Sequence, residues 1–298
     1  MGIKVWIQAA RLRTLPLAFA SIILGNFLAY SKGHFDIWVF SLALLTTLCY
    51  QILSNYANDY GDGVKGTDAN RVGEARATAS GLIPVTTMKR AVIIFTLLSI
   101  LSGTLLSIYA CRKLGWEYQL GFSLLGLFAT WAAINYTMGD KAYGYAGLGD
   151  LFVLIFFGFV GVGGSYYIQT GQWTYDILLP ASSLGLMAIA VLNLNNMRDR
   201  EGDAKSGKRT LALRLGEKGA KAYHAFLLII AFDASFLYNR LNPSSFWQNL
   251  YFLTVPLLIL NLLKVLKANR PQDYEPLLKQ MAITSLLFAL LFGLGKII

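Results

Sequence analysis

Two clusters of asparagine and aspartate lie at the ends of long apolar stretches in this sequence, over residues 55–68 and 195–203. Carboxylates beside a long hydrocarbon stretch are costly in free energy, and they persist chiefly where they serve a function. If the two clusters face each other, they offer carboxylate and amide oxygens, which suit a hard cation such as Mg²⁺ together with a phosphorylated ligand. The clusters therefore predict a metal and phosphate site at a membrane surface.

The spacing within each cluster places its members on common helix faces, because residues four apart are neighbours on a helix. Asn195, Asp199 and Asp203 follow this spacing, and so do Asn58 and Asp62. Such a face would repel itself without counter-charges, and Mg²⁺ held together with waters and substrate phosphates removes the repulsion. We therefore predict one metal site with the ligands Asn58, Asp59, Asp62, Asp68, Asn195, Asp199 and Asp203.

Basic residues surround both clusters. Metal ions neutralise only part of a diphosphate, and Lys or Arg side chains can bind its remaining oxygens. If a diphosphate leaves, the same groups stabilise the charge that develops on it. We predict catalytic roles for Asp62, Asp199, Arg198 and Lys141, although Lys141 also fits a simple topology charge. The residues predicted to bind the diphosphate are Asn58, Lys65, Arg76, Asn195, Lys205, Lys208 and Arg13.

The composition shows what kind of protein positions these residues. Of the 298 residues, 55% are hydrophobic and 14% are charged, whereas soluble domains carry roughly a quarter charged residues. A helix needs about 17–25 apolar residues to cross a bilayer. We count nine such stretches, at about residues 14–31, 36–57, 91–111, 118–138, 149–170, 174–193, 221–240, 247–266 and 277–297. The sequence thus predicts an all-α polytopic membrane protein whose residues 1–298 form one domain.

The distribution of basic residues predicts the orientation of this bundle. If the N-terminus is cytoplasmic, most of the 26 Lys and Arg fall on the cytoplasmic side, which is the usual bias of membrane proteins. The exceptions are Lys32, Arg112, Lys113, Arg240 and Lys296. Both clusters and the polar loops that follow them, at about 59–90 and 194–220, then lie on the cytoplasmic side. The basic residues therefore indicate topology and ligand contacts, and no nucleic-acid partner is expected.

Several other residues leave two interpretations open. Asp150 begins an apolar stretch, where it is either a helix cap or a catalytic acid. Tyr136, Tyr143 and Tyr145 flank the same short connection. They belong either to the interfacial aromatic belt or to a site in which a ring face meets a cation or an aromatic ligand. Asp233, inside another apolar stretch, has no evident chemical role.

In four segments the chain resembles the UbiA-type intramembrane prenyltransferases, and within them the branch that acts on 1,4-dihydroxy-2-naphthoate. The segments are residues 11–19, 54–68, 136–150 and 195–212. Leu12 stands where the family has a proline. Asp62 and Asp68 are six apart, whereas aspartates of the superfamily's first motif are commonly closer, and this wider spacing is expected of the naphthoate branch.

The resemblance implies nine transmembrane helices around a central cavity, with Mg²⁺ bridging a polyprenyl diphosphate to the two motifs. It implies that an electron-rich ring carbon of an aromatic acid attacks the ionised prenyl group. In the naphthoate branch the ring carboxylate is lost as carbon dioxide, which gives demethylmenaquinone. The expected place is the bacterial inner membrane, with the N-terminus and the site loops in the cytoplasm, and the oligomeric state stays open.

Two alternatives remain at this point. One is a prenyltransferase for another acceptor, such as 4-hydroxybenzoate, homogentisate or haem. The other is a secondary transporter for an anionic or cation-coupled substrate. Transporter sites usually lie near the membrane midplane on broken helices, whereas these clusters lie at one interface. The position of the clusters therefore favours the enzyme.

Overall fold

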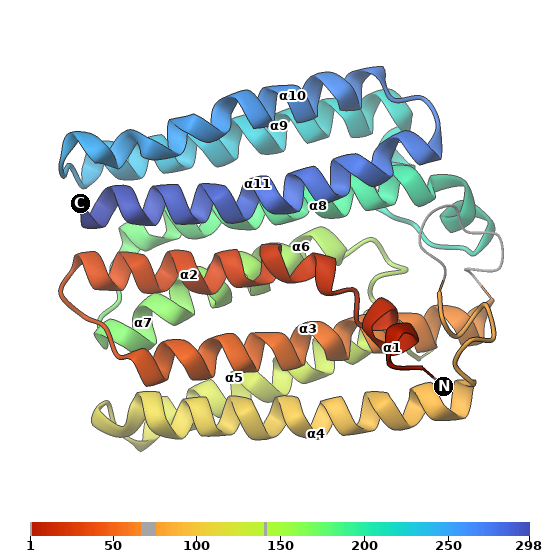
Figure 1. The fold of residues 1–298 in the computed structure, drawn as a ribbon, viewed down its shortest axis with the longest axis horizontal. Coiled ribbons are helices and arrows are strands. Elements are labelled where there is room, and N and C mark those ends of the chain that lie inside the picture. The colour runs from red at the N-terminus through yellow and green to blue at the C-terminus, as the bar shows by residue number, and fades with distance from the viewer. Residues whose placement is uncertain (1, 67–75, 140–141) are drawn as a thin grey trace.

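A computed structural model of the chain describes residues 2–66, 76–139 and 142–298, which are helical and contain no strand (Figure 1). A π-helical segment, Leu154–Gly164, joins two of the helices. The helices are α1 (Ile3–Ala10), α2 (Leu15–Ser31), α3 (Ile37–Lys65), α4 (Val85–Ala110), α5 (Trp116–Asn135), α6 (Gly149–Val153), α7 (Ser165–Thr170), α8 (Leu178–Lys205), α9 (Leu211–Leu241), α10 (Val255–Lys267) and α11 (Pro271–Ile297).

The predicted all-helical membrane protein is confirmed, and each predicted apolar stretch corresponds to a helical segment. In the described part of the chain, eight segments are long and apolar enough to cross a membrane. The remaining predicted stretch corresponds to α5, whose 20 residues also suffice in length and which packs against α3 and α4. The chain termini lie at opposite ends of the bundle, as an odd number of crossings requires (Figure 1).

Two helices extend further than predicted. The first polar loop was expected from about residue 59, but α3 continues to Lys65 and ends at Gly66, whose φ of +71° is a common helix terminus. Likewise α8 continues to Lys205, beyond the expected end near residue 193. Both acidic clusters therefore lie on helices in the described residues. Polar residues can continue a membrane helix where their face points toward protein rather than lipid.

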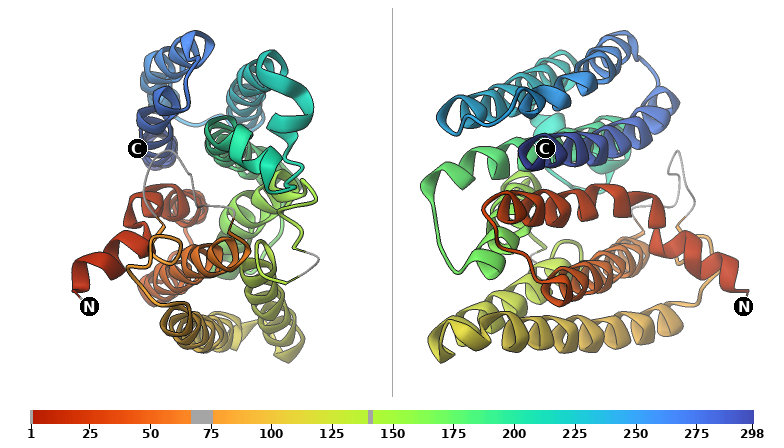
Figure 2. Two further views of the ribbon diagram at one scale, coloured as in Figure 1. Left: turned by 90° about the vertical axis from the view of Figure 1, so that its right-hand side faces the viewer. Right: turned by 60° about the vertical axis from the view of Figure 1, so that its left-hand side comes forward.

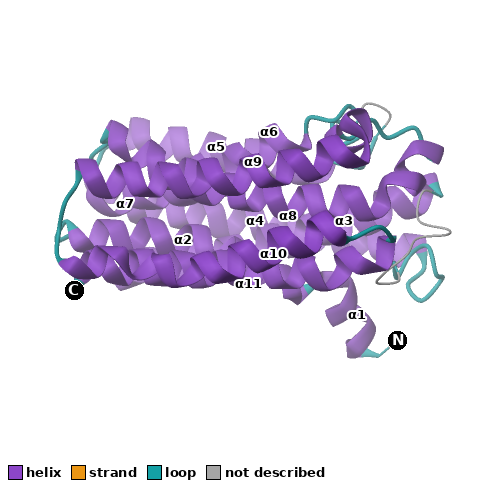
Figure 3. Cartoon of the chain, turned by 90° about the horizontal axis from the view of Figure 1, so that it is seen from above, coloured by secondary structure: helices purple, strands orange, loops and turns teal. Residues whose placement is uncertain are grey.

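The short helix α1 was not predicted as a separate element. It projects to one side at the end of the bundle where the N-terminus lies (Figures 2 and 3). Its buried residues Ala9 and Ala10 pack near α3. The Trp6 ring contacts the Tyr56 ring edge to face, and the two ring centres are 5.5 Å apart. Arg11 then turns the chain into α2 with a φ of 48°, which is rare for a residue with a side chain.

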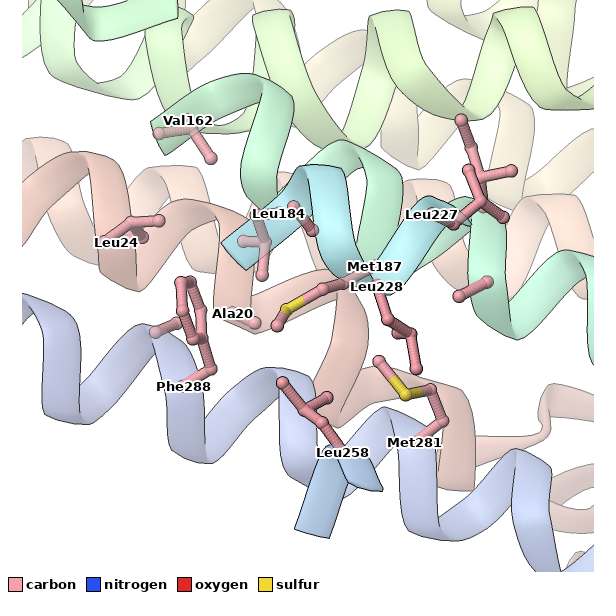
Figure 4. Packing of buried hydrophobic residues seen from close by; sticks show 14 of the residues in the cluster. Ala20, Leu24, Val162, Leu184, Met187, Leu227, Leu228, Leu258, Met281 and Phe288 are labelled. Atoms are coloured by element: carbon pink, nitrogen blue, oxygen red, sulfur yellow. The ribbon is translucent and has the colours of Figure 1, made fainter. Parts of the chain in front are cut away.

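The largest apolar cluster lies between α2, α8, α9 and α11 and the π-helical segment. Figure 4 shows Leu24, Val162, Leu184, Met187 and Phe288 meeting there. Close approach of the π-helical segment to α8 depends on glycine, because a Cβ at Gly158 would lie 2.6 Å from the carbonyl oxygen of Ala181. Long π-helical stretches are rare and often occur at functional sites. This one forms part of the wall of a cavity described below.

Candidate active site

A chamber of about 520 Å³, lined by many charged residues, opens at the end of the bundle where α3 and α8 finish. Its wall also includes the start of α2, the start of α11 and the segment after α8. The structure brings nearly all of the described predicted site residues to this one wall. They are Arg13, Asn58, Asp62, Lys65, Arg76, Asn195, Arg198, Asp199, Asp203, Lys205 and Lys208.

A second cavity, of about 390 Å³, adjoins the chamber on its membrane side. Its wall is mostly apolar and comes from α2, α3, α4, α5 and the π-helical segment. Both cavities share the lining residues Asn58, Tyr136, Val153, Phe157 and Leu192. A charged chamber that continues into an apolar cavity suits an amphiphilic ligand with an anionic head and a hydrocarbon tail.

Asp62 is held by several partners from other parts of the chain. Lys208 lies 3.3 Å from its oxygens, Arg76 lies 3.4 Å away, and the Tyr145 hydroxyl donates a hydrogen bond of 3.0 Å. Lys208 also lies 3.9 Å from Asp203 and therefore links the two acidic clusters. The Asp62 side chain is only 2% exposed, and a carboxylate this deep needs such partners.

Arg198 is the centre of the second cluster. Its guanidinium binds Asp199 in a bidentate pair of 2.7 and 2.9 Å, and it donates to the Asn195 side chain at 2.7 Å. It also pairs with Glu275 at the start of α11, and Glu275 pairs in turn with Arg13. The Arg198 side chain is 2% exposed, so these carboxylates compensate a buried charge.

Glu275 and Tyr145 were not predicted as site residues. Glu275 is separated from Arg198 by 77 positions, and no spacing pattern connects the two. Tyr145 was recognised only as one of three tyrosines around a connection. In the structure its ring faces Lys65 at 4.1 Å and Lys208 at 5.0 Å from the ring centre. For Tyr145 the structure therefore supports the site interpretation over the aromatic belt.

Lys65 and Asn58 are held by the segment that follows α5. The Lys65 ammonium donates to the carbonyl oxygens of Thr137 at 2.9 Å and Gly139 at 2.8 Å. The Thr137 hydroxyl donates to the Asn58 side chain at 3.2 Å. Tyr136 lies at the junction of the two cavities, because its side chain belongs to the lining of both.

Asp59 has a different environment from the one predicted. Its carboxylate accepts hydrogen bonds from the backbone amides of Ala77 at 3.1 Å and Thr78 at 3.0 Å. Both oxygens thus hold the segment before α4 against α3, and Asp59 is not among the residues that line the chamber. Asp150 accepts a bond of 2.8 Å from Tyr223, a partner on α9. The predicted residues Asp68 and Lys141 lie outside the described part of the chain.

The chamber has the donor chemistry of a magnesium and diphosphate site, since carboxylate and amide oxygens alternate with Lys and Arg. Within the described ranges, no three His, Cys, Asp or Glu side chains are grouped closely enough to hold a metal ion by themselves. The carboxylates are instead paired with the basic residues. This arrangement suits a metal that is held by protein carboxylates and substrate phosphates together.

Comparisons with known proteins agree with this geometry. Residues 18–291 match the UbiA prenyltransferase family. A relative in Escherichia coli (strain K12), named 1,4-dihydroxy-2-naphthoate octaprenyltransferase, is 45% identical over 293 residues, which cover 98% of this chain and 94% of the relative.

Solved structures share the fold. A UbiA homolog from Aeropyrum pernix K1 in the apo form has a TM-score of 0.68 at 16% identity, with 95% of each chain covered. A UbiA homolog from Archaeoglobus fulgidus bound to GPP and Mg²⁺ has a TM-score of 0.63 at 16% identity, covering 98% of this chain and 99% of that one. Sequence and fold lead to the same assignment: the chain belongs to the UbiA prenyltransferase family.

Proposed function

We propose that this protein transfers a polyprenyl group from polyprenyl diphosphate to 1,4-dihydroxy-2-naphthoate, with loss of carbon dioxide. The product is demethylmenaquinone, released in its quinol form because no oxidant takes part. The observation that carries the proposal is a chamber of mixed charge that opens into an apolar cavity, in a chain 45% identical to a relative named for this reaction. Membership of a prenyltransferase family favours the enzyme over the transporter alternative. The chamber also lies at one end of the bundle, whereas transporter sites usually lie near the membrane midplane.

The two cavities divide the binding of the donor. The diphosphate would occupy the chamber, where Lys65, Arg76, Arg198 and Lys208 supply positive charge. The hydrocarbon tail would lie in the apolar cavity, which excludes water from the reacting carbon. The bond that breaks would then lie near Asn58 and Tyr136, because these residues line both cavities.

Magnesium fits this chamber as the cofactor. Asn58, Asp62, Asn195, Asp199 and Asp203 would hold it, and the Archaeoglobus fulgidus homolog of the same fold is bound to GPP and Mg²⁺. When bound, Mg²⁺ neutralises diphosphate charge and makes the diphosphate a better leaving group. The described carboxylates are paired with Lys208, Arg76 and Arg198, and a diphosphate offers those cations alternative partners.

The proposed reaction needs few covalent roles from the protein. The bond between the first prenyl carbon and its oxygen breaks, and the electron pair leaves with the diphosphate. The ring carbon that bears the carboxylate attacks the prenyl carbon and forms a new carbon–carbon bond. The carboxylate carbon then departs as carbon dioxide, and its bonding electrons restore the aromatic ring. Lys208, Arg76 and Arg198 stabilise the departing diphosphate, while the apolar wall keeps water away.

We place the protein in the bacterial inner membrane with the chamber facing the cytoplasm. Basic residues gather at the chamber end, which supports this orientation. A single cysteine introduced as Ser206→Cys in a cysteine-free background should resist a membrane-impermeant reagent in intact cells. Ser244→Cys, exposed at the opposite end, should react. The reverse pattern would contradict the orientation.

The acceptor is tested with naphthoate labelled at its carboxyl carbon. Purified protein in nanodiscs, supplied with Mg²⁺ and polyprenyl diphosphate, should release one labelled carbon dioxide per prenylated product. Chelation of Mg²⁺ by EDTA should stop both the release of carbon dioxide and the formation of the prenylated product. A prenylated product that keeps the carboxylate would contradict the assignment of naphthoate as the acceptor. A product formed from 4-hydroxybenzoate and not from naphthoate would identify 4-hydroxybenzoate as the acceptor instead. Absence of product from every aromatic acid would contradict the proposed enzyme activity.

A further inference from the structure

We propose that Tyr145 is a positioning residue of the diphosphate chamber. Its hydroxyl orients the Asp62 carboxylate for the metal, and its ring holds Lys65 and Lys208 beside the departing diphosphate. The inference rests on the proposed function, because that function identifies the ligand as a magnesium diphosphate. It assigns a role to a tyrosine that lies outside both acidic clusters.

The backbone of Tyr145 is fixed from two sides. Its amide donates to the carbonyl oxygen of Ala142 at 3.1 Å, and its carbonyl oxygen accepts from the Arg209 amide at 2.9 Å. Gly147 permits the close contact of these two segments, since a Cβ there would lie 2.4 Å from the carbonyl oxygen of Arg209. Tyr145 therefore joins the segment before α6 to the segment after α8.

The hydroxyl of Tyr145 differs in kind from Lys208 and Arg76, the two basic residues described beside Asp62. It is a neutral donor at 3.0 Å, whereas Lys208 and Arg76, at 3.3 and 3.4 Å, are cations. Cations can exchange a carboxylate for phosphate oxygens when a diphosphate arrives. The phenol gains no such charge attraction and stays with Asp62. A carboxylate has about four lone-pair positions, so a single bond from Tyr145 would not by itself prevent Asp62 from binding a metal ion.

The ring of Tyr145 acts on two lysines from distant parts of the chain. The ammonium of Lys65, at the end of α3, lies 4.1 Å from the ring centre, and that of Lys208, after α8, lies 5.0 Å away. The face of an aromatic ring attracts cations. Tyr145 thus holds two like charges against one ring, and both lysines line the chamber proposed for the diphosphate.

Two substitutions separate these contributions. Tyr145→Phe removes the hydrogen bond to Asp62 and keeps the ring, while Tyr145→Leu removes both. The matched control is Tyr223→Phe, which removes a phenol–carboxylate bond of 2.8 Å to Asp150, a carboxylate that, unlike Asp62, does not line the chamber. Two quantities are measured in nanodiscs: the Mg²⁺ concentration for half-maximal turnover, and the calorimetric Kd of inorganic diphosphate in the presence of Mg²⁺.

We expect Tyr145→Phe to raise the half-saturating Mg²⁺ concentration about tenfold, as loss of a bond to a charged group predicts, with a smaller change in kcat. Tyr145→Leu should in addition weaken diphosphate binding severalfold. Tyr223→Phe should match the wild type in both quantities. If Tyr145→Leu fails to fold, as its thermal unfolding would show, the Mg²⁺ dependence of Tyr145→Phe decides alone.

The outcomes distinguish this inference from the proposed function. If the wild type makes product and Tyr145→Phe has the same Mg²⁺ dependence, the role of Tyr145 is overturned while the function stands. If no aromatic acid is prenylated but Tyr145→Leu still weakens the binding of inorganic diphosphate in the presence of Mg²⁺, the positioning role is supported and the function fails. Equal weakening by Tyr223→Phe would show a general structural effect and overturn the inference.

Discussion

The two acidic clusters look like copies of one motif, yet their surroundings differ. On α8, Arg198 binds Asn195 and Asp199 from its own helix, so much of that cluster is organised locally. On α3, Asp62 is held by Arg76, Tyr145 and Lys208, which all come from other segments. The asparagine and aspartate of each half are four residues apart. The half on α8 is held largely by a neighbour on its own helix, whereas the half on α3 is held by residues from other segments.

Two neighbouring aspartates within the first cluster also have different surroundings. Asp59 and Asp62 both lie on α3, but Asp59 binds backbone amides whereas Asp62 lines the chamber. The two residues are three apart, which is slightly less than one helical turn, so their side chains leave α3 in different directions. This difference places the Asp59 carboxylate against backbone amides and the Asp62 carboxylate in the chamber wall. Substitutions in the two clusters can test these distinctions.

The largest effects are expected from Asp62→Ala and Asp199→Ala. Each removes a carboxylate of the proposed metal site, and we expect turnover at saturating Mg²⁺ to fall by at least about a hundredfold. Asp199→Ala should fold normally, because Arg198 retains Glu275 and Asn195. Initial rates of product formation give the effect, and the thermal unfolding midpoint is the control. Near-normal activity in either variant would remove that aspartate from the site.

An intermediate effect is expected from Glu275→Gln, which removes a charge shared by Arg13 and Arg198. We expect the KM for polyprenyl diphosphate to rise about tenfold, because the two guanidiniums lose their common anchor. Glu217→Gln is the matched control, since Glu217 pairs with Lys221 and Arg200 outside the chamber wall. An unchanged KM for Glu275→Gln would show that the second cluster needs no support from α11.

The smallest catalytic effect is expected from Asp59→Ala. Loss of the acceptor for two buried amides should lower the free energy of unfolding by about 1–3 kcal/mol, seen as a lower unfolding midpoint. The half-saturating Mg²⁺ concentration should stay at the wild-type value, because Asp59 faces Ala77 and Thr78. A large increase in that concentration with unchanged stability would support the predicted role of Asp59 as a metal ligand.

The sequence by itself determined the membrane class, the positions of the helices and the two clusters. These features depend on local patterns: the length of an apolar stretch is set by bilayer thickness, and a spacing of four residues is set by helix geometry. The ends of α3 and α8 were placed too early, because polar residues on a membrane helix cannot be told from loop residues until their buried face is known.

Only the tertiary structure decided which polar side chains meet. Glu275 is 77 positions from Arg198, and Tyr145 is 83 positions from Asp62, so no local pattern connects either pair. The sequence also did not predict that α1 packs against α3, or that the Asp59 carboxylate accepts hydrogen bonds from backbone amides. Helices form from interactions a few residues apart, whereas a site depends on contacts that exist only after the helices pack.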